Sequence, residues 1–566
     1  MNSLFVERDY VAATVNRLAA EGIPGPLARV LAARGVVSMA DLHLATRDLH
    51  APGGLAHVDE AARLLADAVD ARRHMTIVAD YDCDGATACA VAVRGLRAFG
   101  ASIDYVVPNR FEFGYGLTPE IVDLAAARSP RPELLITVDN GIASVEGVER
   151  AAQLGIAVLI TDHHLPGERL PAAAAIVNPN QRGCGFPSKH LAGVGVMFYV
   201  LMALRAELRR RGRFTAETQP RLDPLLDLVA LGTVADVVRL DRNNRILVAA
   251  GLQRVQSGRM QAGIAALFQI AGRSTRTAHA GDFGFAVGPR INAAGRLTDM
   301  TIGIECLLTD DADRALELAA RLEELNRERR AIESDMNLDA LAELSRPEYD
   351  DGRRTICLFN AEWHPGVVGL VASRIKDRFH RPTIAFATLD GSALRGSGRS
   401  IEGVHLRDTL DLVTKAAPHL VDKFGGHAMA AGLTLKQAFF EPFVQAFEAA
   451  TRASADAQLF ARTLATDGPL APKDITFGLI EAIERQIWGQ GFPSPLFANE
   501  FTVLDQRLVN EQHLRLALDL AGKRFDAIWF RRTATLPSRA RLAYRPIVDE
   551  FQGLRRISLL IEAVSL

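Results

Sequence analysis

The chain has 566 residues, of which 48% are hydrophobic, so it can form several packed domains. Its 65 Lys and Arg residues nearly balance its 67 Asp and Glu residues, and any contact with nucleic acid must therefore come from local basic clusters. The 5 cysteines lie far apart without a CxxC pair, which argues against a disulfide framework or a zinc–thiolate site and predicts a reducing, cytoplasmic location. The N-terminus shows no signal-peptide pattern, and no run of about 18 uncharged apolar residues predicts a membrane span.

Residues 1–75 are expected to form an N-terminal helical region, because their apolar residues recur at helical spacing. From residue 76 onward, short runs rich in Val, Ile and Leu ("TIVAD", "IDYVVP", "LLITVD", "AVLITD") alternate with alanine-rich amphipathic segments. This alternation predicts a parallel sheet in a domain that spans residues 76–309. The charged helical pattern of residues 310–345 predicts a long connecting helix.

In the remainder of the chain, the pattern of apolar and polar residues changes twice. Strand-like runs "TICLFN" and "RPTIAFAT" flank the helical "GVVGLVASRIKDRF", which predicts a smaller α/β domain over residues 346–452. Residues 460–566 contain 5 runs with partial period-two alternation, separated by short turns. These runs predict a small β-barrel, for which an OB-fold is one candidate. The expected fold class is therefore α/β, with a parallel-sheet domain, a connecting helix, a second α/β domain and a C-terminal barrel.

Acidic or histidine residues follow three successive strand-like runs: Asp80, Asp139, and Asp162 with its neighbours. Asp236 follows a helix-like apolar run. Ligands of an open parallel sheet collect beyond the carboxyl ends of its strands, so these groups are expected to converge. Buried carboxylates repel one another unless cations neutralise them, and carboxylates combined with imidazole suit Mn²⁺ or Mg²⁺. A single motif of this kind could instead be a helix N-cap, for which Asp84 is a candidate.

The motifs "DYDCDG", "TVDNG", "TDHH" and "GTVADVV" resemble the four motifs of the DHH phosphoesterase family. The segment "FGGHAMAAG" (424–432) is similar to the glycine–histidine signature of the associated C-terminal domain of that family. Further segments, including "PNRFEFGYGL", "VGPRINAAGRLTDM", "EWHPGVVGLVASRI", "RGSGRS" and "GQGFPSPLF", resemble the bacterial RecJ exonuclease branch. The resemblance extends in order over residues 30 to 566.

The resemblance implies two divalent ions, Mn²⁺ or Mg²⁺, with Asp139 as the bridging ligand. It implies catalytic roles for His164, facing the phosphoryl group, and for Asp84, in or beside the ligand set. The remaining metal ligands that it implies are Asp80, Asp82, His163 and Asp236.

Polar residues in glycine-bearing, turn-rich motifs are expected to bind the substrate, because arginine binds phosphate in a bidentate manner and glycine allows close approach of the backbone. Surface salt bridging is the alternative for any single arginine. The aromatic residues Phe111, Phe113 and Tyr115 could stack on bases or belong to the core. The expected substrate-binding residues are Arg110, Arg290, Asn292, Arg296, Arg374, Ser397, Arg399 and His427.

The resemblance implies a metal-dependent 5′→3′ exonuclease that degrades single-stranded DNA to 5′-mononucleotides in DNA repair and recombination. It further implies a single-strand-binding protein and a helicase as partners. Two alternatives remain open: a DHH phosphoesterase that acts on short oligonucleotides, cyclic dinucleotides or pyrophosphate, and a catalytically inactive DNA-binding relative. The C-terminal barrel argues against the first, because a small substrate does not need it, and the intact motif acids argue against the second.

Overall fold

The computed structural model describes residues 4–109, 113–346, 352–551 and 554–565. The chain divides into two compact units. One unit comprises residues 36–326 and 484–494, and the other comprises residues 1–35, 327–483 and 495–566. Each unit is described by itself. No helix of the described ranges is long and apolar enough to cross a membrane.

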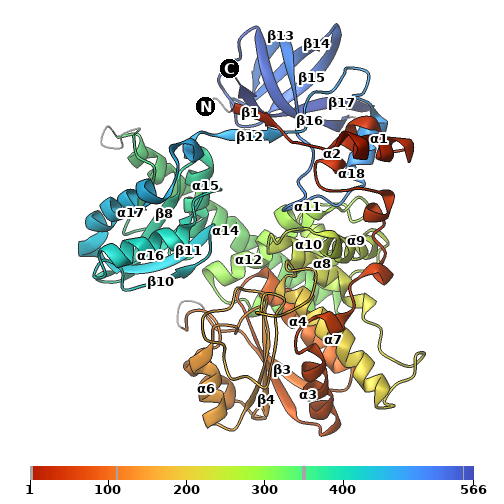
Figure 1. Ribbon diagram of the computed structural model, residues 1–566, viewed down its shortest axis with the longest axis vertical. Helices are drawn as coiled ribbons and strands as arrows, with labels where there is room; N and C mark the ends of the chain where they lie inside the picture. The colour runs from red at the N-terminus through yellow and green to blue at the C-terminus, as the bar shows by residue number, and fades with distance from the viewer. Residues whose placement is uncertain (1–3, 110–112, 347–351, 552–553, 566) are drawn as a thin grey trace. The chain divides into compact units, whose positions relative to one another are not determined.

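The first unit is built on a parallel sheet with strand order β3-β2-β4-β5-β6, which confirms the predicted sheet (Figure 1). Its strands are almost continuously apolar, as expected when helices cover both faces of a parallel sheet. In the register, Ala79 lies opposite Val138, and Val138 lies opposite Thr161, so the carboxyl ends of three strands meet at one edge. The strands are β2 (His74–Ala79), β3 (Ser102–Val106), β4 (Leu134–Val138), β5 (Ala157–Thr161) and β6 (Ala175–Val177).

Helices cover this sheet and extend beyond it. Ile121 of α5 and Val148 of α6 pack in one core cluster with Val78 and Leu135 of the sheet. The helices used below are α4 (Cys83–Ala98), α5 (Pro119–Ala126), α6 (Val145–Gln153), α7 (Gly193–Arg210), α8 (Leu226–Ala235), α9 (Arg242–Gln256) and α12 (Gly288–Leu297). The predicted connecting helix is confirmed as α14 (Ala312–Leu344), which spans the boundary between the units.

Residues 484–494 come from the C-terminal part of the sequence but belong to the first unit. The amide of Leu240 donates to the carbonyl of Gln490 at 2.7 Å, and the guanidinium of Arg245 lies 4.2 Å from the centre of the Phe492 ring. Trp488 stacks on Phe492 with ring centres 5.2 Å apart. This segment therefore attaches beside the chain that follows Asp236.

The second unit contains a five-stranded sheet and a closed barrel. The sheet has the order β10-β11-β9-β8-β7, and α15 (Val368–Phe379) packs on it. The barrel has the order β13-β14-β15-β17-β16, and all five of its strands match the runs predicted from sequence. The sheet strands are β7 (Ile356–Phe359), β8 (Thr383–Asp390), β9 (Ala393–Arg399), β10 (Lys423–Gly426) and β11 (Ala430–Lys436). The barrel strands are β13 (Phe497–Val509), β14 (His513–Leu520), β15 (Lys523–Trp529), β16 (Arg539–Phe551) and β17 (Leu554–Ser565).

The prediction of an entirely helical N-terminal region is wrong for its first described residues. Leu4–Glu7 form strand β1, which pairs in parallel with β12 (Thr463–Thr466). Phe5 is buried and joins a core cluster with Leu496, Ala498 and Ala543. A strand of 4 residues is too short for periodicity to identify, and its partner lies at the other end of the sequence.

Candidate metal centre

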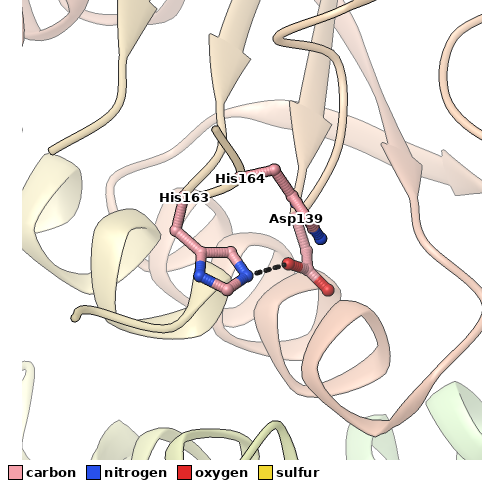
Figure 2. A group of neighbouring side chains, drawn as sticks. All are labelled: Asp139, His163 and His164. Atoms are coloured by element: carbon pink, nitrogen blue, oxygen red, sulfur yellow. Dashed lines mark ion pairs between the residues drawn. The ribbon is translucent and has the colours of Figure 1, made fainter. Parts of the chain in front are cut away.

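Three strands of the parallel sheet deliver acidic and histidine residues to one edge. Asp80 follows β2, Asp139 follows β4, and His163 lies just beyond β5. His163 Nε2 is 3.1 Å from Asp139 Oδ1 and 3.5 Å from Asp236 Oδ2. Figure 2 shows the ring of His163 facing Asp139, with both histidines on the loop that follows β5. The predicted convergence of strand ends is confirmed, and it includes the residue that follows α8.

The converging side chains form three overlapping groups, within each of which the ligand atoms lie no more than 4.8 Å apart. Asp139 belongs to two groups, and His163 also belongs to two. The geometry thus brings three sets of ligand atoms together around the shared residues Asp139 and His163. The groups are Asp80 with Asp82 and Asp139, Asp139 with His163 and His164, and Asp84 with His163 and Asp236.

The burial of these carboxylates fits bound divalent cations. Asp139 is 1% exposed, and burial followed by repulsion from Asp84 and Asp82 raises its pKa well above the usual range. Burial and the same two neighbours likewise raise the pKa of Asp236. Among the described residues, Asp139 Oδ1 and Asp236 Oδ2 accept no well-directed hydrogen bond, although both lie near the Nε2 of His163. Buried acceptors without donors are costly, and carboxylate oxygens with imidazole are the donor set that Mn²⁺ and Mg²⁺ accept.

Asp82 and Asp84 play different structural roles at the start of α4. Asp82, not Asp84, is the N-cap, because its Oδ1 accepts hydrogen bonds from the amides of Asp84 and Gly85 at 2.9 and 3.0 Å. The Asp84 carboxylate is buried and accepts from the amides of Gly193 and Val194 at 2.6 and 3.0 Å. Burial and the charge of Asp82 raise the pKa of Asp84 to about 7, although these two amides oppose the shift. Asp84 therefore joins α4 to the first turn of α7.

Asp139 adopts a left-handed backbone conformation with φ 62°. Aspartate tolerates this region better than most residues. Asn140 braces the same turn, since its side-chain amide donates to the carbonyls of Val78 and Val138 at 3.1 and 2.9 Å. The first residue of α7 also approaches Asp139 closely, because a Cβ on Gly193 would lie 2.5 Å from Asp139 Cβ. Only glycine fits at the position where α7 meets this carboxylate.

His164 is held by two residues to which the sequence assigned no catalytic role. Its Nδ1 lies 2.7 Å from Asp162 Oδ1, and the hydroxyl of Tyr115 lies 3.2–3.3 Å from both ring nitrogens. Burial disfavours the charged ring, but the hydrogen bond and charge of Asp162 outweigh it and raise the pKa of His164 to about 9. Tyr115 was expected to stack on a base or to enter the core. Only the position of Asp162 two residues before His164 could have signalled the pairing from sequence.

Three predicted substrate-binding residues lie on α12, beside the loop of residues 80–84 that follows β2. Arg290 is buried and pairs with Glu323 at 2.7 Å. Asn292 Oδ1 accepts a hydrogen bond from the amide of Cys83 at 2.8 Å, which fixes α12 against the loop between Asp82 and Asp84. Arg296 is half-buried on the same helix. Two further expectations, Arg110 and Phe111, lie outside the described residues.

The remaining predicted substrate-binding residues lie in the second unit. Arg399 donates to Ser397 Oγ at 3.2 Å, and a Cβ on Gly369 of α15 would lie 2.8 Å from that hydroxyl. Arg374 lies on the same helix, is largely exposed and pairs with Glu333 at 2.9 Å. His427 is exposed, and its amide donates to the carbonyl of Ala430, whose residue pairs with Arg399 in the sheet. The structure therefore gathers this set on neighbouring elements.

Three family models match the chain. The DHH family, N-terminal domain, matches residues 74–233, the DHHA1 domain matches residues 352–453, and the RecJ OB domain matches residues 466–563. The chain is 47% identical over 558 residues to the single-stranded-DNA-specific exonuclease RecJ of Dickeya dadantii and 46% identical over 558 residues to that of Escherichia coli. Both alignments cover 96% of each chain.

Two solved structures of RecJ from Thermus thermophilus are also similar to the chain. The complex with Mn²⁺ has a TM-score of 0.82 and 29% identity, and the match covers 99% of this chain and 79% of the other. The complex with Mg²⁺ has a TM-score of 0.77 and 27% identity, and the match covers 100% of this chain and 78% of the other. The metals in these relatives are those that suit the donor set around Asp139.

Proposed function

The chain belongs to the RecJ family of single-stranded-DNA-specific exonucleases, and from this premise we propose that it is a metal-dependent exonuclease acting on single-stranded DNA. It degrades the strand from 5′ to 3′ and releases 5′-mononucleotides. The observation that carries the proposal is the group of carboxylates and histidines, buried or half-buried, around Asp139. A C-terminal barrel of the kind that holds single strands supports the choice of a polymeric substrate over a small one.

Five residues hold the metal ions in this proposal. The chemistry that two bound divalent cations would supply is activation of a water molecule and neutralisation of the negative charge in an in-line displacement at phosphorus. Asp84 keeps the start of α7 fixed against the site, through its contacts with two amides. The Nδ1 of His164 pairs with Asp162, and its Nε2 lies beside the hydroxyl of Tyr115; in this proposal the Nε2 donates to a phosphoryl oxygen when the strand is bound. The five ligands are Asp80, Asp82, Asp139, His163 and Asp236.

The basic residues bind the DNA in this proposal. Arg374, Ser397 and Arg399 offer guanidinium groups and a hydroxyl on adjoining elements, which suits a terminal 5′-phosphate. His427 lies on the neighbouring turn and adds a further donor. Asn292 of α12 holds the loop of residues 80–84, and Arg290 and Arg296 on the same helix contact the strand in this proposal.

End-labelled single-stranded DNA tests the proposal directly. With Mn²⁺ present, a 5′-labelled strand should release its label as a mononucleotide from the earliest time points, and chelation should stop the release. A ladder of shortened 5′-labelled strands would mean digestion from the 3′ end. Activity confined to strands of a few nucleotides would indicate a small-substrate phosphoesterase. Tight binding without cleavage in any divalent metal would indicate an inactive DNA-binding relative.

The proposed cellular role is DNA repair and recombination in the cytoplasm. An enzyme that accepts only unpaired strands depends on another activity to separate the duplex, so a helicase is a proposed partner. A single-strand-binding protein is the second, because it covers the same substrate. Each purified partner, when added to the enzyme and a duplex with a recessed end, should increase the rate of nucleotide release. An unchanged rate would argue against the partnership.

A further inference from the structure

Phe285 is an aromatic residue on the surface of the unit that carries the metal centre. Its surface is 82% exposed, the largest fraction among the exposed large hydrophobic side chains of the described residues. Phe283, two positions earlier, is fully buried and meets the ring of Phe268 edge-on at 5.9 Å. Isolated exposed apolar residues are common, so the position of Phe285 has to carry any functional argument.

Phe285 belongs to a π-helical turn, η5 (Phe283–Val287), directly before α12. The amide of Gly288 donates to the carbonyl of Phe283, and Pro289 follows, which cannot donate to the carbonyl of Phe285. A Cβ on Gly288 would lie 3.1 Å from Ala235 Cβ, and one on Gly284 would contact Val234. The turn therefore sits closely on the last turn of α8, immediately before Asp236. π-helical turns are rare and frequently occur at functional sites.

The element that follows this turn reaches the other side of the metal centre. Asn292 of α12 accepts from the amide of Cys83, which lies between Asp82 and Asp84. One continuous segment thus contacts both the chain before Asp236 and the loop that carries the first acidic motif. Phe285 therefore belongs to a segment whose neighbouring residues pack against the chain on either side of the acidic cluster.

The loop before this turn carries basic side chains. Arg273, Arg276 and His279 are exposed, and the first and last of these lie within 3.7 Å of Asp282. Aromatic rings interleaved with basic groups form the surface on which single strands stack their bases and contact their phosphates. We infer that Phe285 is a stacking platform for one unpaired base of the DNA strand, and that the 272–279 loop contacts the adjacent phosphates. This inference rests on the proposed function and adds a subsite to it.

Abasic substitutions in the DNA test this subsite. The Mn²⁺-loaded full chain is titrated with a 5′-phosphorylated, fluorescent single strand whose first linkages are non-hydrolysable phosphonates. An abasic residue is placed at successive positions of the strand. Replacement Phe285→Ala should raise Kd by about five- to 150-fold, as loss of one stacked base does. One abasic position should raise the Kd of the wild type by a similar factor and leave the Kd of the variant unchanged.

Control variants separate stacking from general effects. Phe285→Trp should retain affinity, and Phe285→Leu should lose it, because leucine keeps apolar surface but has no ring face. Leu124→Ala removes an exposed apolar side chain on α5 and should bind as the wild type does. Phe285→Leu also provides the measurement if the alanine variant folds poorly.

Two results overturn the inference. The first is a Kd that is unchanged in Phe285→Leu or Phe285→Ala. The second is a rise in Kd, caused by an abasic residue, that is equal in the wild type and the variant at every position of the strand. A wild type that neither binds nor cleaves single strands would remove the proposed function together with this subsite. A wild type that cleaves them, with binding insensitive to residue 285, would remove the subsite alone.

Discussion

Asp139 is the side chain on which the proposed chemistry depends most. It is buried, adopts positive φ, and belongs to two of the three groups of ligand atoms. Such a carboxylate destabilises the metal-free fold, because repulsion and desolvation both act on its charged form. A divalent cation beside Asp139 would remove both penalties, because it would neutralise the carboxylate.

Asp139→Asn should abolish turnover without unfolding the protein. The amide has the same size and tolerates the same backbone region, but it cannot supply a charged oxygen to a cation. The rate should fall by more than about a hundredfold, the upper limit for residues that only orient ligands. The melting temperature without metal should stay the same or rise. Single-turnover cleavage and thermal unfolding measure the two effects, and Asp123→Asn on α5 is the exposed control. Retained turnover in Asp139→Asn would contradict the metal assignment.

Tyr115→Phe should separate a positioning role from base stacking. The hydroxyl contacts the ring of His164 and the carbonyl of Asp139, so its loss should lower kcat by about tenfold and change KM little. The variant keeps the aromatic ring, so a stacking role would leave kcat and KM as they are. Tyr115→Leu then serves as the second measurement, since loss of stacking raises KM with kcat unchanged. Steady-state kinetics on single-stranded DNA distinguish the two patterns.

Among the elements, the first turn of α7 determines how closely helix and metal site approach. Its amides bind Asp84, and its first residue contacts Asp139. Gly193→Ala places a methyl group against Asp139 and should lower both Mn²⁺ affinity and stability, the latter by about 1–3 kcal/mol. The nearest neighbour of a Cβ on Gly195 of the same helix would be a terminal methyl of Leu191 at 3.2 Å, so Gly195→Ala should cost much less than Gly193→Ala. Manganese titration and denaturant unfolding check this, and equal effects of the two variants would contradict it.

Two arginines in the barrel lie directly opposite each other. Arg507 of β13 pairs in register with Arg515 of β14, and both are exposed. Like charges at such positions destabilise a sheet by roughly 0.2–1 kcal/mol, so the pair fits a surface that receives phosphate. Arg515→Gln should raise stability slightly, weaken single-strand binding and reduce its salt dependence. Arg556→Gln is the control. Arg556 lies opposite Asp549, an opposite charge, so its removal should not raise stability. Unchanged DNA affinity in Arg515→Gln would argue against the contact.

At the level of the whole molecule, the N-terminus is built into the unit that contains the barrel. Phe5 of β1 packs against Leu496, Ala498 and Ala543, and the strand pairs with β12. Phe5→Ala should lower the free energy of unfolding of that unit by about 3–5 kcal/mol. Leu4→Ala, which removes an exposed side chain of the same strand, should have little effect.

Mn²⁺ affinity should be unchanged in Phe5→Ala, because the metal centre lies in the other unit and substitutions at independent sites act separately. Denaturant unfolding measures stability when it is followed by the fluorescence of Trp529 in β15, with Trp363 and Trp488 replaced by Phe. Mn²⁺ titration measures the site. A loss of metal affinity in step with stability would mean that the two units unfold as one.

The amino-acid sequence by itself determined four of the five strands of the parallel sheet, the connecting helix and all five barrel strands, because their apolar periodicity is local information. It did not reveal β6, which has only 3 residues. It also identified the converging acids, since parallel strands bring their carboxyl ends to one edge. It did not reveal β9, β10 and β11, whose glycine-rich sequences carry little strand propensity and are stabilised by neighbouring strands.

The tertiary structure alone decided contacts between residues that are distant in sequence. The pairing of β1 with β12, the binding of the α7 amides by Asp84, and the placement of Tyr115 over His164 all depend on how separate elements pack. Phe285 shows the same limit, since its neighbour Phe283 is equally aromatic and only packing buries one ring and exposes the other. Periodicity and motifs report which residue types recur along the chain, whereas burial and long-range contacts arise only when the chain closes on itself.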